Sequence, residues 1–268
     1  MSSSTSSGAR STAAKPVAPP KSQPVLRAQH LSKSYHSPVL RDLDVGIEPG
    51  QFVAIMGPSG SGKSTLLHCL SGMDRPSAGS VLLGDTEITT MSEKELAALR
   101  LTRFGFVFQQ AHLMTTLCLL DNIVLPGFLA GLRPRPEITA RGEELMESMG
   151  IADLAASGVT EVSGGQLQRA GICRALINDP GIVFADEPTG ALNSTTALQI
   201  LDLLGQVHAS GTTLVMVTHD AQVAARADRV LVLVDGRIEE DLALGRYREA
   251  EAPSRLTTVT EALQRRSV

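Results

Sequence analysis

The stretch Gly57-Pro58-Ser59-Gly60-Ser61-Gly62-Lys63-Ser64-Thr65 decides the fold of this chain. An apolar run precedes it at residues 52–56, and a second apolar segment follows it at residues 66–70. This succession predicts a buried strand, a glycine-rich turn and a helix start, the context that a phosphate-binding G-x-x-x-x-G-K-[ST] loop requires. Glycines let the backbone approach a ligand, so the loop N–H groups and the positive end of the helix dipole point at an anion.

Two side chains of the loop suit a triphosphate and its metal ion. The Lys63 ammonium reaches the terminal phosphates and supports catalysis there, and the Ser64 hydroxyl is placed to hold Mg²⁺. A plain strand–turn–helix corner is the alternative interpretation. The apolar flanks favour the phosphate loop.

The composition of the 268-residue chain, 43% hydrophobic and 19% charged, is typical of a soluble globular protein. The net charge is −4, and residues 1–34 carry basic side chains without any acidic one, so the remainder is more acidic still. This balance argues against a nucleic-acid partner. Three widely spaced cysteines without a C-x-x-C motif indicate reduced thiols in a cytosolic protein.

The ends of the chain differ in composition from its centre. Residues 1–24 are rich in Ser, Ala and Pro, which predicts a disordered tail, with an organelle transit peptide as the alternative. Residues 245–268 read as a polar extension with at most a short helix through Leu256, Val259 and Leu263. No apolar run reaches the ~18 residues that a spanning helix needs, so we expect no membrane crossing by this chain itself.

A second helix start offers another anion site. Ser163, Gly164, Gly165 and Gln166 precede a helical pattern over residues 167–177, and Ser163 with Gln166 forms a capping box. The free N–H groups at this helix start bind anions as the first loop does. A simple one-site nucleotide enzyme would not need both.

Three polar residues follow predicted buried strands. Asp186 and Glu187 end the apolar run at 182–185, and His219 follows the run at 212–218. Asp186 would hold hydrated Mg²⁺ beside Ser64, and Glu187 would take a proton from the attacking water. His219 would bond the γ-phosphate and hold that water. Adjacent carboxylates after a strand are otherwise ordinary surface residues.

Aromatic and amide residues supply further candidates. Tyr35 ends a predicted strand, where its ring either stacks on adenine or belongs to the core. Phe104, Phe106 and Phe108 alternate, which predicts a strand with one buried aromatic face. Gln109 follows them as a weak Mg²⁺ ligand or as an ordinary loop residue.

The segment at residues 113–132 is unusually apolar, although Asp121, Asn122 and Pro126 interrupt it. Two interpretations stay open. Its side chains pack into the core, or they form a surface that receives a partner.

Together these features resemble the ATP-binding subunits of ABC transporters over residues 25–244. The matching motifs, in the family's order, are the A-loop (Tyr35), Walker A (57–64), the Q-loop (Gln109), the signature (162–166), Walker B with its base (Asp186, Glu187) and the switch histidine (His219). The resemblance implies an α/β fold: a P-loop NTPase (RecA-like) core with a parallel sheet, an antiparallel β subdomain and an α-helical subdomain carrying the signature. It implies ATP and Mg²⁺ as cofactors and ATP hydrolysis as the reaction.

The resemblance also implies partners. Two chains would form a head-to-tail dimer, in which Ser163 of one closes on the nucleotide at Lys63 of the other. An integral membrane permease would dock near residues 109–132, which places the protein at the cytoplasmic face of the cell membrane. No nucleic acid is expected.

Three longer stretches of the sequence are similar to one branch of this family, at residues 55–65, 105–110 and 186–192. That branch serves macrolide export, lipoprotein release, antimicrobial-peptide detoxification and division-linked signalling. Two residues depart from the family pattern: Val162 replaces the usual leucine of the signature, and Asn193 replaces the usual aspartate of the D-loop. The second change removes a charge at the dimer interface.

Three functions follow from these motifs. The first is an ATPase subunit that powers a separate permease for export of a drug, peptide or lipoprotein-like substrate. The second is a nucleotide-switched signalling module that acts on a membrane partner without transport. The third, a soluble ABC-type ATPase of DNA repair or translation, is disfavoured because the chain has neither heptads nor an internal repeat.

Overall fold

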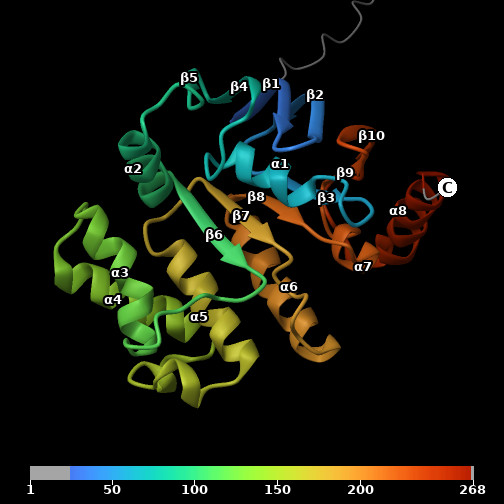
Figure 1. The fold of residues 1–268 in the computed structure, drawn as a ribbon. Coiled ribbons are helices and arrows are strands. Elements are labelled where there is room, and N and C mark those ends of the chain that lie inside the picture. The colour runs from blue at the N-terminus through green and yellow to red at the C-terminus, as the bar shows by residue number, and fades with distance from the viewer. Residues whose placement is uncertain (1–24, 267–268) are drawn as a thin grey trace, which may run out of the picture.

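A computed structural model describes residues 25–266 of the chain (Figure 1). The predicted disordered tail at residues 1–24 lies outside these residues. Within them, the strands form one antiparallel sheet and one mostly parallel sheet, with α1 packed between the two. The helices α3, α4 and α5 pack on one another on one side of the parallel sheet.

The antiparallel sheet has the order β2-β1-β4-β5. Its strands alternate between buried and exposed residues, because one face packs on the core and the other meets solvent. Its bounds are β1 Leu26–Ser34, β2 Pro38–Ile47, β4 Ala78–Leu83 and β5 Thr86–Glu87.

The larger sheet has the order β10-β9-β3-β8-β7-β6, and all its pairings are parallel except that of β10 with β9. Asp235 and Gly236 join that last pair with φ of 47° and 77°, the positive values that an Asp-Gly hairpin turn requires. The strands are β3 Phe52–Met56, β6 Phe104–Phe108, β7 Ile182–Asp186, β8 Thr213–Val217, β9 Arg229–Val234 and β10 Arg237–Ala243.

The parallel strands separate two hydrophobic cores. In β3, Val53 and Ile55 face the core shared with α1 and the antiparallel sheet, whereas Phe52, Ala54 and Met56 face the core shared with the helices. A strand that is buried on both faces must be apolar at every position, which explains the continuous apolar run before the phosphate loop.

The helices begin where their capping residues predict. Ser92 and Ser163 both form capping boxes, and Asn193 accepts a hydrogen bond from the Thr196 N–H at 3.0 Å. The α-helices are α1 Lys63–Leu70, α2 Glu93–Arg103, α3 Leu119–Ala130, α4 Arg135–Ser148, α5 Gly164–Leu176, α6 Ser194–Ala209, α7 Ala221–Ala224 and α8 Ala252–Arg266; short 3₁₀ turns lie at Ala152–Leu154, Val159–Glu161 and Glu249–Glu251.

The predicted aromatic face of β6 is buried only at its start. Phe104 is buried, but Phe106 and Phe108 are half-buried and stack on each other with ring centroids 6.1 Å apart. The prediction of a fully buried face is wrong there, because β6 is the edge strand of its sheet. Val107, on the opposite face, is the buried residue.

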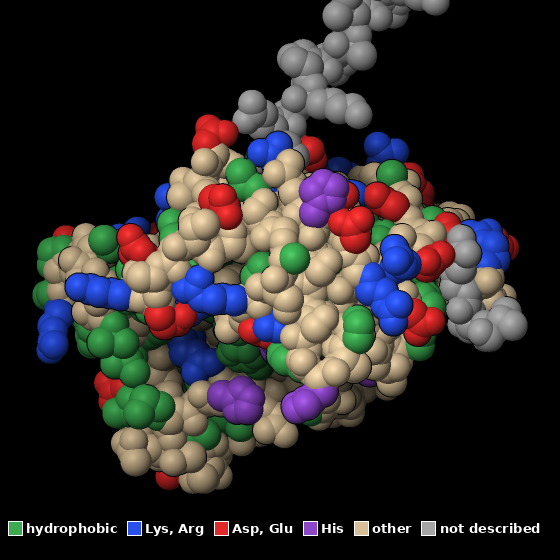
Figure 2. Space-filling model, turned by 45° about the horizontal axis from the view of Figure 1, so that its top comes forward, with side chains coloured by type: hydrophobic (Ala, Val, Ile, Leu, Met, Phe, Trp, Pro, Cys, Tyr) green, Lys and Arg blue, Asp and Glu red, His purple; other side chains and the backbone are tan. Residues whose placement is uncertain are grey.

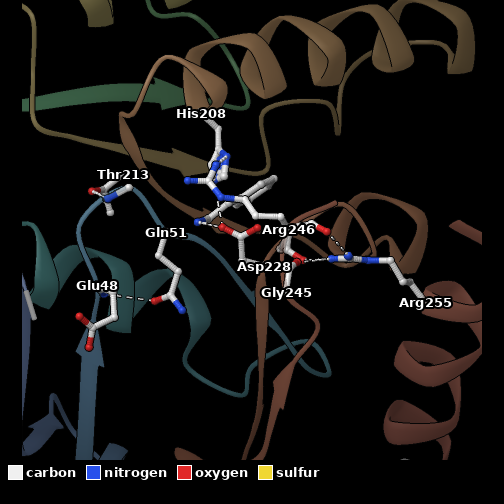
Figure 3. Close-up of polar contacts among 11 residues, drawn as sticks. Glu48, Gln51, His208, Thr213, Asp228, Gly245, Arg246 and Arg255 are labelled. Carbon is white, nitrogen blue, oxygen red and sulfur yellow. Dashed lines mark hydrogen bonds and ion pairs between the residues drawn. The ribbon is translucent and has the colours of Figure 1, made fainter. Parts of the chain in front are cut away.

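The segment after Gly245 is more ordered than predicted. It carries the 15-residue helix α8, whose Val259 and Ala262 are fully buried. The guanidinium of the buried Arg255 donates hydrogen bonds to the carbonyl oxygens of Ala225 and Ala227 and, as Figure 3 shows, to those of the Gly245–Arg246 segment. These bonds fix α8 to the domain.

Two features of residues 25–266 bear on predictions made from the sequence. No helix in this range is long and apolar enough to span a membrane. The predicted α/β architecture, with a parallel core sheet, an antiparallel β part and a helical part that carries Ser163, is confirmed.

Candidate functional site

The glycines of the 57–65 loop have conformations that other residues adopt poorly. Gly57 has φ of 143°, and a Cβ atom there would lie 1.9 Å from the Leu233 carbonyl oxygen. Gly62 has φ of 100° and caps α1, so the loop turns directly into the helix. The predicted strand, loop and helix are therefore present, and the loop leads directly to the first backbone N–H groups of α1.

Lys63 folds back over its own loop. Its Nζ donates hydrogen bonds to the carbonyl oxygens of Gly57 at 3.0 Å and Pro58 at 2.9 Å. Burial lowers the pKa of Lys63, and the nearby carboxylates of Glu187 and Asp186 oppose that shift. The ammonium is held at the loop in the position from which it can reach a bound phosphate.

Ser64 and Asp186 lie in contact at the carboxyl ends of the parallel strands. The Ser64 Oγ donates to the Asp186 Oδ1 at 3.0 Å, and the His68 Nε2 lies 3.9 Å from the other carboxylate oxygen. Burial raises the pKa of Asp186, while the Ser64 hydrogen bond counteracts the rise. In the loop, the Ser61 Oγ is buried without a hydrogen-bond partner.

These oxygen atoms fit a magnesium ion. Mg²⁺ prefers hard oxygen ligands and usually takes one or two carboxylates together with substrate phosphates and water. Ser64 and Asp186 supply one hydroxyl and one carboxylate within hydrogen-bond distance of each other. Between residues 25 and 266, no cluster of three or more His, Cys, Asp or Glu is placed to hold a metal ion.

Glu187 and His219 form a direct pair. The His219 Nδ1 and the Glu187 Oε2 lie 2.5 Å apart, with the histidine side chain mostly exposed and the glutamate largely buried. Glu187 has a positive φ of 47°, and its N–H donates to the Val217 carbonyl oxygen at 3.0 Å. This turn at the end of β7 aims the carboxylate at the site, as expected of a residue that activates water.

Gln109 lies near Glu187. A Cβ atom on Gly190 would be 2.9 Å from the Gln109 Nε2 and 3.2 Å from the Glu187 Oε2, so both side chains lie beside that glycine. No described contact joins Gln109 to Ser64. Its role as a Mg²⁺ ligand stays a prediction.

The second anion site lies against a different part of the chain. Ser163 caps α5, where its N–H donates to the Gln166 Oε1 at 2.7 Å. A Cβ atom on Gly165 would lie 2.5 Å from Thr196 at the start of α6. Over residues 25–266, no hydrogen bond or ion pair joins this helix start to the Lys63 loop.

Tyr35 is a surface residue. The residue is 58% exposed, so the interpretation as a core aromatic is wrong. Its Oη donates a hydrogen bond to the Asp74 carboxylate, and the Lys33 Nζ lies 4.6 Å from the ring centroid. Sequence reasoning missed Lys33 and Asp74, because no local pattern connects positions so far apart in the chain.

The apolar segment at 113–132 is buried in part and exposed in part, so core packing and a partner surface each fit some of its residues. Leu119, Ile123 and Val124 are buried in α3, whereas Leu129 and Leu132 are about two-thirds exposed. Beside this segment, a cavity of about 460 Å³ opens between α2, β6 and α5. Its lining includes Met73, Phe104, Phe106, Phe108, His112 and Arg174.

A glycine loop at a helix start, a lysine over it and an aspartate at the end of another parallel strand of the same sheet define a P-loop nucleoside triphosphatase. The comparisons with known proteins narrow that class. Residues 40–190 match the family model described as "ABC transporter". The chain belongs to the ABC transporter family, as an ATP-binding, ATP-hydrolysing cassette.

Curated and solved relatives agree with this assignment. The chain is 46% identical over 218 residues to a macrolide export ATP-binding/permease protein, MacB, of Rhodopseudomonas palustris, a match that covers 81% of this chain and 33% of the relative. The chain thus spans about a third of the length of the curated relatives that it matches.

Two solved structures have the same fold. The first is the dimeric structure of MJ0796, a bacterial ABC transporter cassette, with 36% identity, a TM-score of 0.77 and coverage of 83% of this chain and all of the other. The second is a dimeric post-hydrolysis state of MJ0796 bound to ADP and Pi, with 35% identity, a TM-score of 0.76 and the same coverage.

Proposed function

We propose that this cassette hydrolyses MgATP with the residues described above and thereby powers a membrane permease. The observation that carries the proposal is the Glu187–His219 pair, 2.5 Å apart, at the sheet edge where Ser64 bonds Asp186. A base, its partner and a metal site are thus joined at one edge of one sheet.

Each residue has a distinct task in this proposal. Lys63 and the loop N–H groups bind the phosphates, and Ser64 and Asp186 hold Mg²⁺, which neutralises charge on the phosphate oxygens when it is bound. Glu187 accepts the proton of the attacking water, and His219 orients Glu187. Gln109 lies beside Gly190, as Glu187 does, and completes the edge of the site.

The second anion site supports a dimer. Ser163 and Lys63 share no hydrogen bond within the described chain, so the two helix starts are separate sites of one protomer. A head-to-tail dimer would bring Ser163, Gly164 and Gly165 of one protomer to the phosphates held by its partner. The titles of the two MJ0796 structures describe dimers, which supports this arrangement.

The cavity beside β6 supports docking of the permease. Its aromatic lining offers apolar surface of the kind that receives a partner, and the same segment of the chain carries the exposed Leu129 and Leu132. The names of the curated relatives join ATP-binding and permease functions, which supports a permease for this cassette as well. The cassette would then act at the cytoplasmic face of the membrane, in export of a drug, peptide or lipoprotein-like substrate.

No nucleic-acid partner is included in the proposal. On the face shown in Figure 2, Lys and Arg side chains are interspersed with Asp and Glu rather than gathered into one basic patch. A continuous basic patch is the usual feature of nucleic-acid binding.

The variant Glu187→Gln tests the proposal. Removing the base while keeping the side-chain volume should lower ATP turnover roughly 100-fold or more, since general bases contribute about that much. The same variant should accumulate as an ATP-bound dimer, measured by size-exclusion chromatography with light scattering. Glu143→Gln, on the exposed face of α4, is the matched control and should behave as the wild type. Unchanged turnover in Glu187→Gln would remove the base from the proposal.

A further inference from the structure

We propose that Asp74 and Lys33 are positioning residues that hold the ring of Tyr35 ready to receive the adenine base. These three residues are called the Tyr35 clamp. The inference rests on the proposed binding of ATP and on base stacking by Tyr35, and it adds two residues that neither the motifs nor the comparisons assign.

Asp74 uses both carboxylate oxygens in the Tyr35 clamp. One oxygen accepts hydrogen bonds from the Lys33 Nζ at 2.6 Å and from the Arg75 N–H at 2.7 Å. The other oxygen accepts the hydrogen bond of the Tyr35 hydroxyl. The far end of the tyrosine ring is therefore tied to a carboxylate that is itself fixed by two further donors.

Lys33 covers one face of the ring. Its side chain is only 10% exposed, and its Nζ donates to the Arg75 carbonyl oxygen at 2.6 Å while it lies 4.6 Å from the ring centroid. That distance is within the range of a cation–π contact. Because Tyr35 is 58% exposed, the opposite face of the ring is the one open to a base.

The Tyr35 clamp is attached to the phosphate loop through α1. The N–H groups of Met73 and Asp74 both donate to the His68 carbonyl oxygen, so Asp74 follows directly from the last turn of that helix. Ser77 bonds Ser34 next to Tyr35. Since α1 begins at Lys63, one short rigid helix sets the distance between the base-stacking ring and the phosphate site.

An exposed tyrosine without such partners would sample several rotamers, and binding a base would have to order it. Groups that are fixed before binding avoid that entropic cost. The expected effect of the Tyr35 clamp is therefore on the affinity for ligands that carry a base, and not on the affinity for phosphates alone.

The test compares two ligands on the full chain by isothermal titration calorimetry: MgATP and magnesium tripolyphosphate, which lacks the base. Tyr35→Phe and Asp74→Asn should each weaken MgATP binding about threefold to tenfold and leave tripolyphosphate binding unchanged. Combining both changes should weaken MgATP binding no further than the more weakly binding single variant does, because both changes break the same hydrogen bond between Tyr35 and Asp74. Asp85→Asn, an exposed turn residue, is the matched control and should bind both ligands as the wild type does.

Three outcomes overturn the inference. If Asp74→Asn weakens both ligands equally, Asp74 acts on the loop or on folding, and a thermal melt identifies the second case. The second outcome is that Tyr35→Phe and Asp74→Asn bind MgATP like the wild type while Tyr35→Ala binds it about tenfold more weakly. The ring would then stack on the base, but the Tyr35 clamp would contribute nothing to binding. If Tyr35→Ala binds MgATP like the wild type, base stacking itself fails and the inference with it.

Discussion

At the scale of single residues, the site is prepared by short polar contacts that a ligand would exchange for its own. Lys63 bonds two loop carbonyl groups, and Ser64 bonds Asp186. Each of these groups is held in place by the others, so the loss of one side chain removes both a ligand contact and part of the site's geometry.

Lys63→Ala is expected to abolish nucleotide binding. Truncation removes the only ammonium at the loop and leaves the phosphate charge without its closest counter-charge, so affinity for MgATP should fall about a hundredfold or more. A fluorescent ATP analogue measures the loss, and Lys94→Ala, on the exposed face of α2, is the control. Wild-type affinity in Lys63→Ala would contradict the assignment of the loop.

Asn193 keeps a structural function that aspartate would also supply. It caps α6 through the Thr196 N–H, so the missing D-loop charge leaves the helix start intact. Asn193→Ala should lower the free energy of unfolding by about 1 kcal/mol, whereas Asn193→Asp should preserve it. Chemical denaturation measures both. Equal stability of Asn193→Ala and the wild type would show that the cap contributes nothing.

At the scale of elements, a polar junction joins the end of α6 to the start of β9. The Asp228 carboxylate accepts the Phe52 N–H at 2.9 Å and pairs with the His208 Nε2 at 3.0 Å, and Arg246 approaches the histidine from the segment before α8 (Figure 3). His208 is buried. Burial lowers the pKa of His208, although Asp228 opposes the shift.

This junction predicts an acid-sensitive contribution to stability. Because the pKa of His208 is lower in the folded state than its ordinary value of 6.5, the unfolded chain binds the proton more readily. Stability is therefore fully present above pH 6.5 and falls as the pH drops toward the folded pKa, with a slope of at most about 1.4 kcal/mol per pH unit. Denaturation of His208→Gln between pH 5 and 7.5 should show a shallower pH dependence than the wild type. Identical slopes would refute this.

The elements that the sequence predicts are those with local chemistry. Ser92 and Ser163 mark helix starts through residues three positions ahead, and Asp235-Gly236 marks a hairpin. The half-buried faces of Phe106 and Phe108 depend instead on which strand lies at the sheet edge, and that order is a property of the whole topology. The docking of α8 through Arg255 depends likewise on carbonyl groups 28 and 30 positions away.

The site shows the same division between local and long-range features. Motif spacing predicted the loop, the Asp186–Glu187 pair and His219, because each follows an apolar strand and parallel strands end at one edge. The contact of Tyr35 with Asp74 joins positions 39 apart, and the one between Gln109 and Gly190 joins loops from different strands. Such contacts follow from the packing of α1 and β6, which residue spacing alone does not define.

At the scale of the whole molecule, the proposed head-to-tail dimer makes a prediction about mixed protomers. Lys63→Ala and Ser163→Arg should each destroy both sites of their own homodimer. In a mixed dimer of the two variants, one site carries both defects and the other carries neither. We therefore expect mixtures to regain trapping of MgATP at about one nucleotide per mixed dimer, measured by filtration with radiolabelled ATP in the Glu187→Gln background.

The control for this experiment is a mixture of Lys63→Ala with a second Lys63 variant, Lys63→Met, which leaves every dimer without an intact loop. Absence of trapping in the first mixture, with mixed dimers confirmed by affinity tags, would mean that Ser163 does not act across the interface. Recovery confined to the first mixture would place Ser163 at the nucleotide of the opposite protomer.

The hydrogen bonds that Lys63 makes to Gly57 and Pro58 also bear on the order of events in a turnover cycle. We expect arriving phosphates to take the ammonium from these backbone oxygens, which would accept it again when the phosphates leave. The loop would then return to its starting hydrogen bonds after each product release.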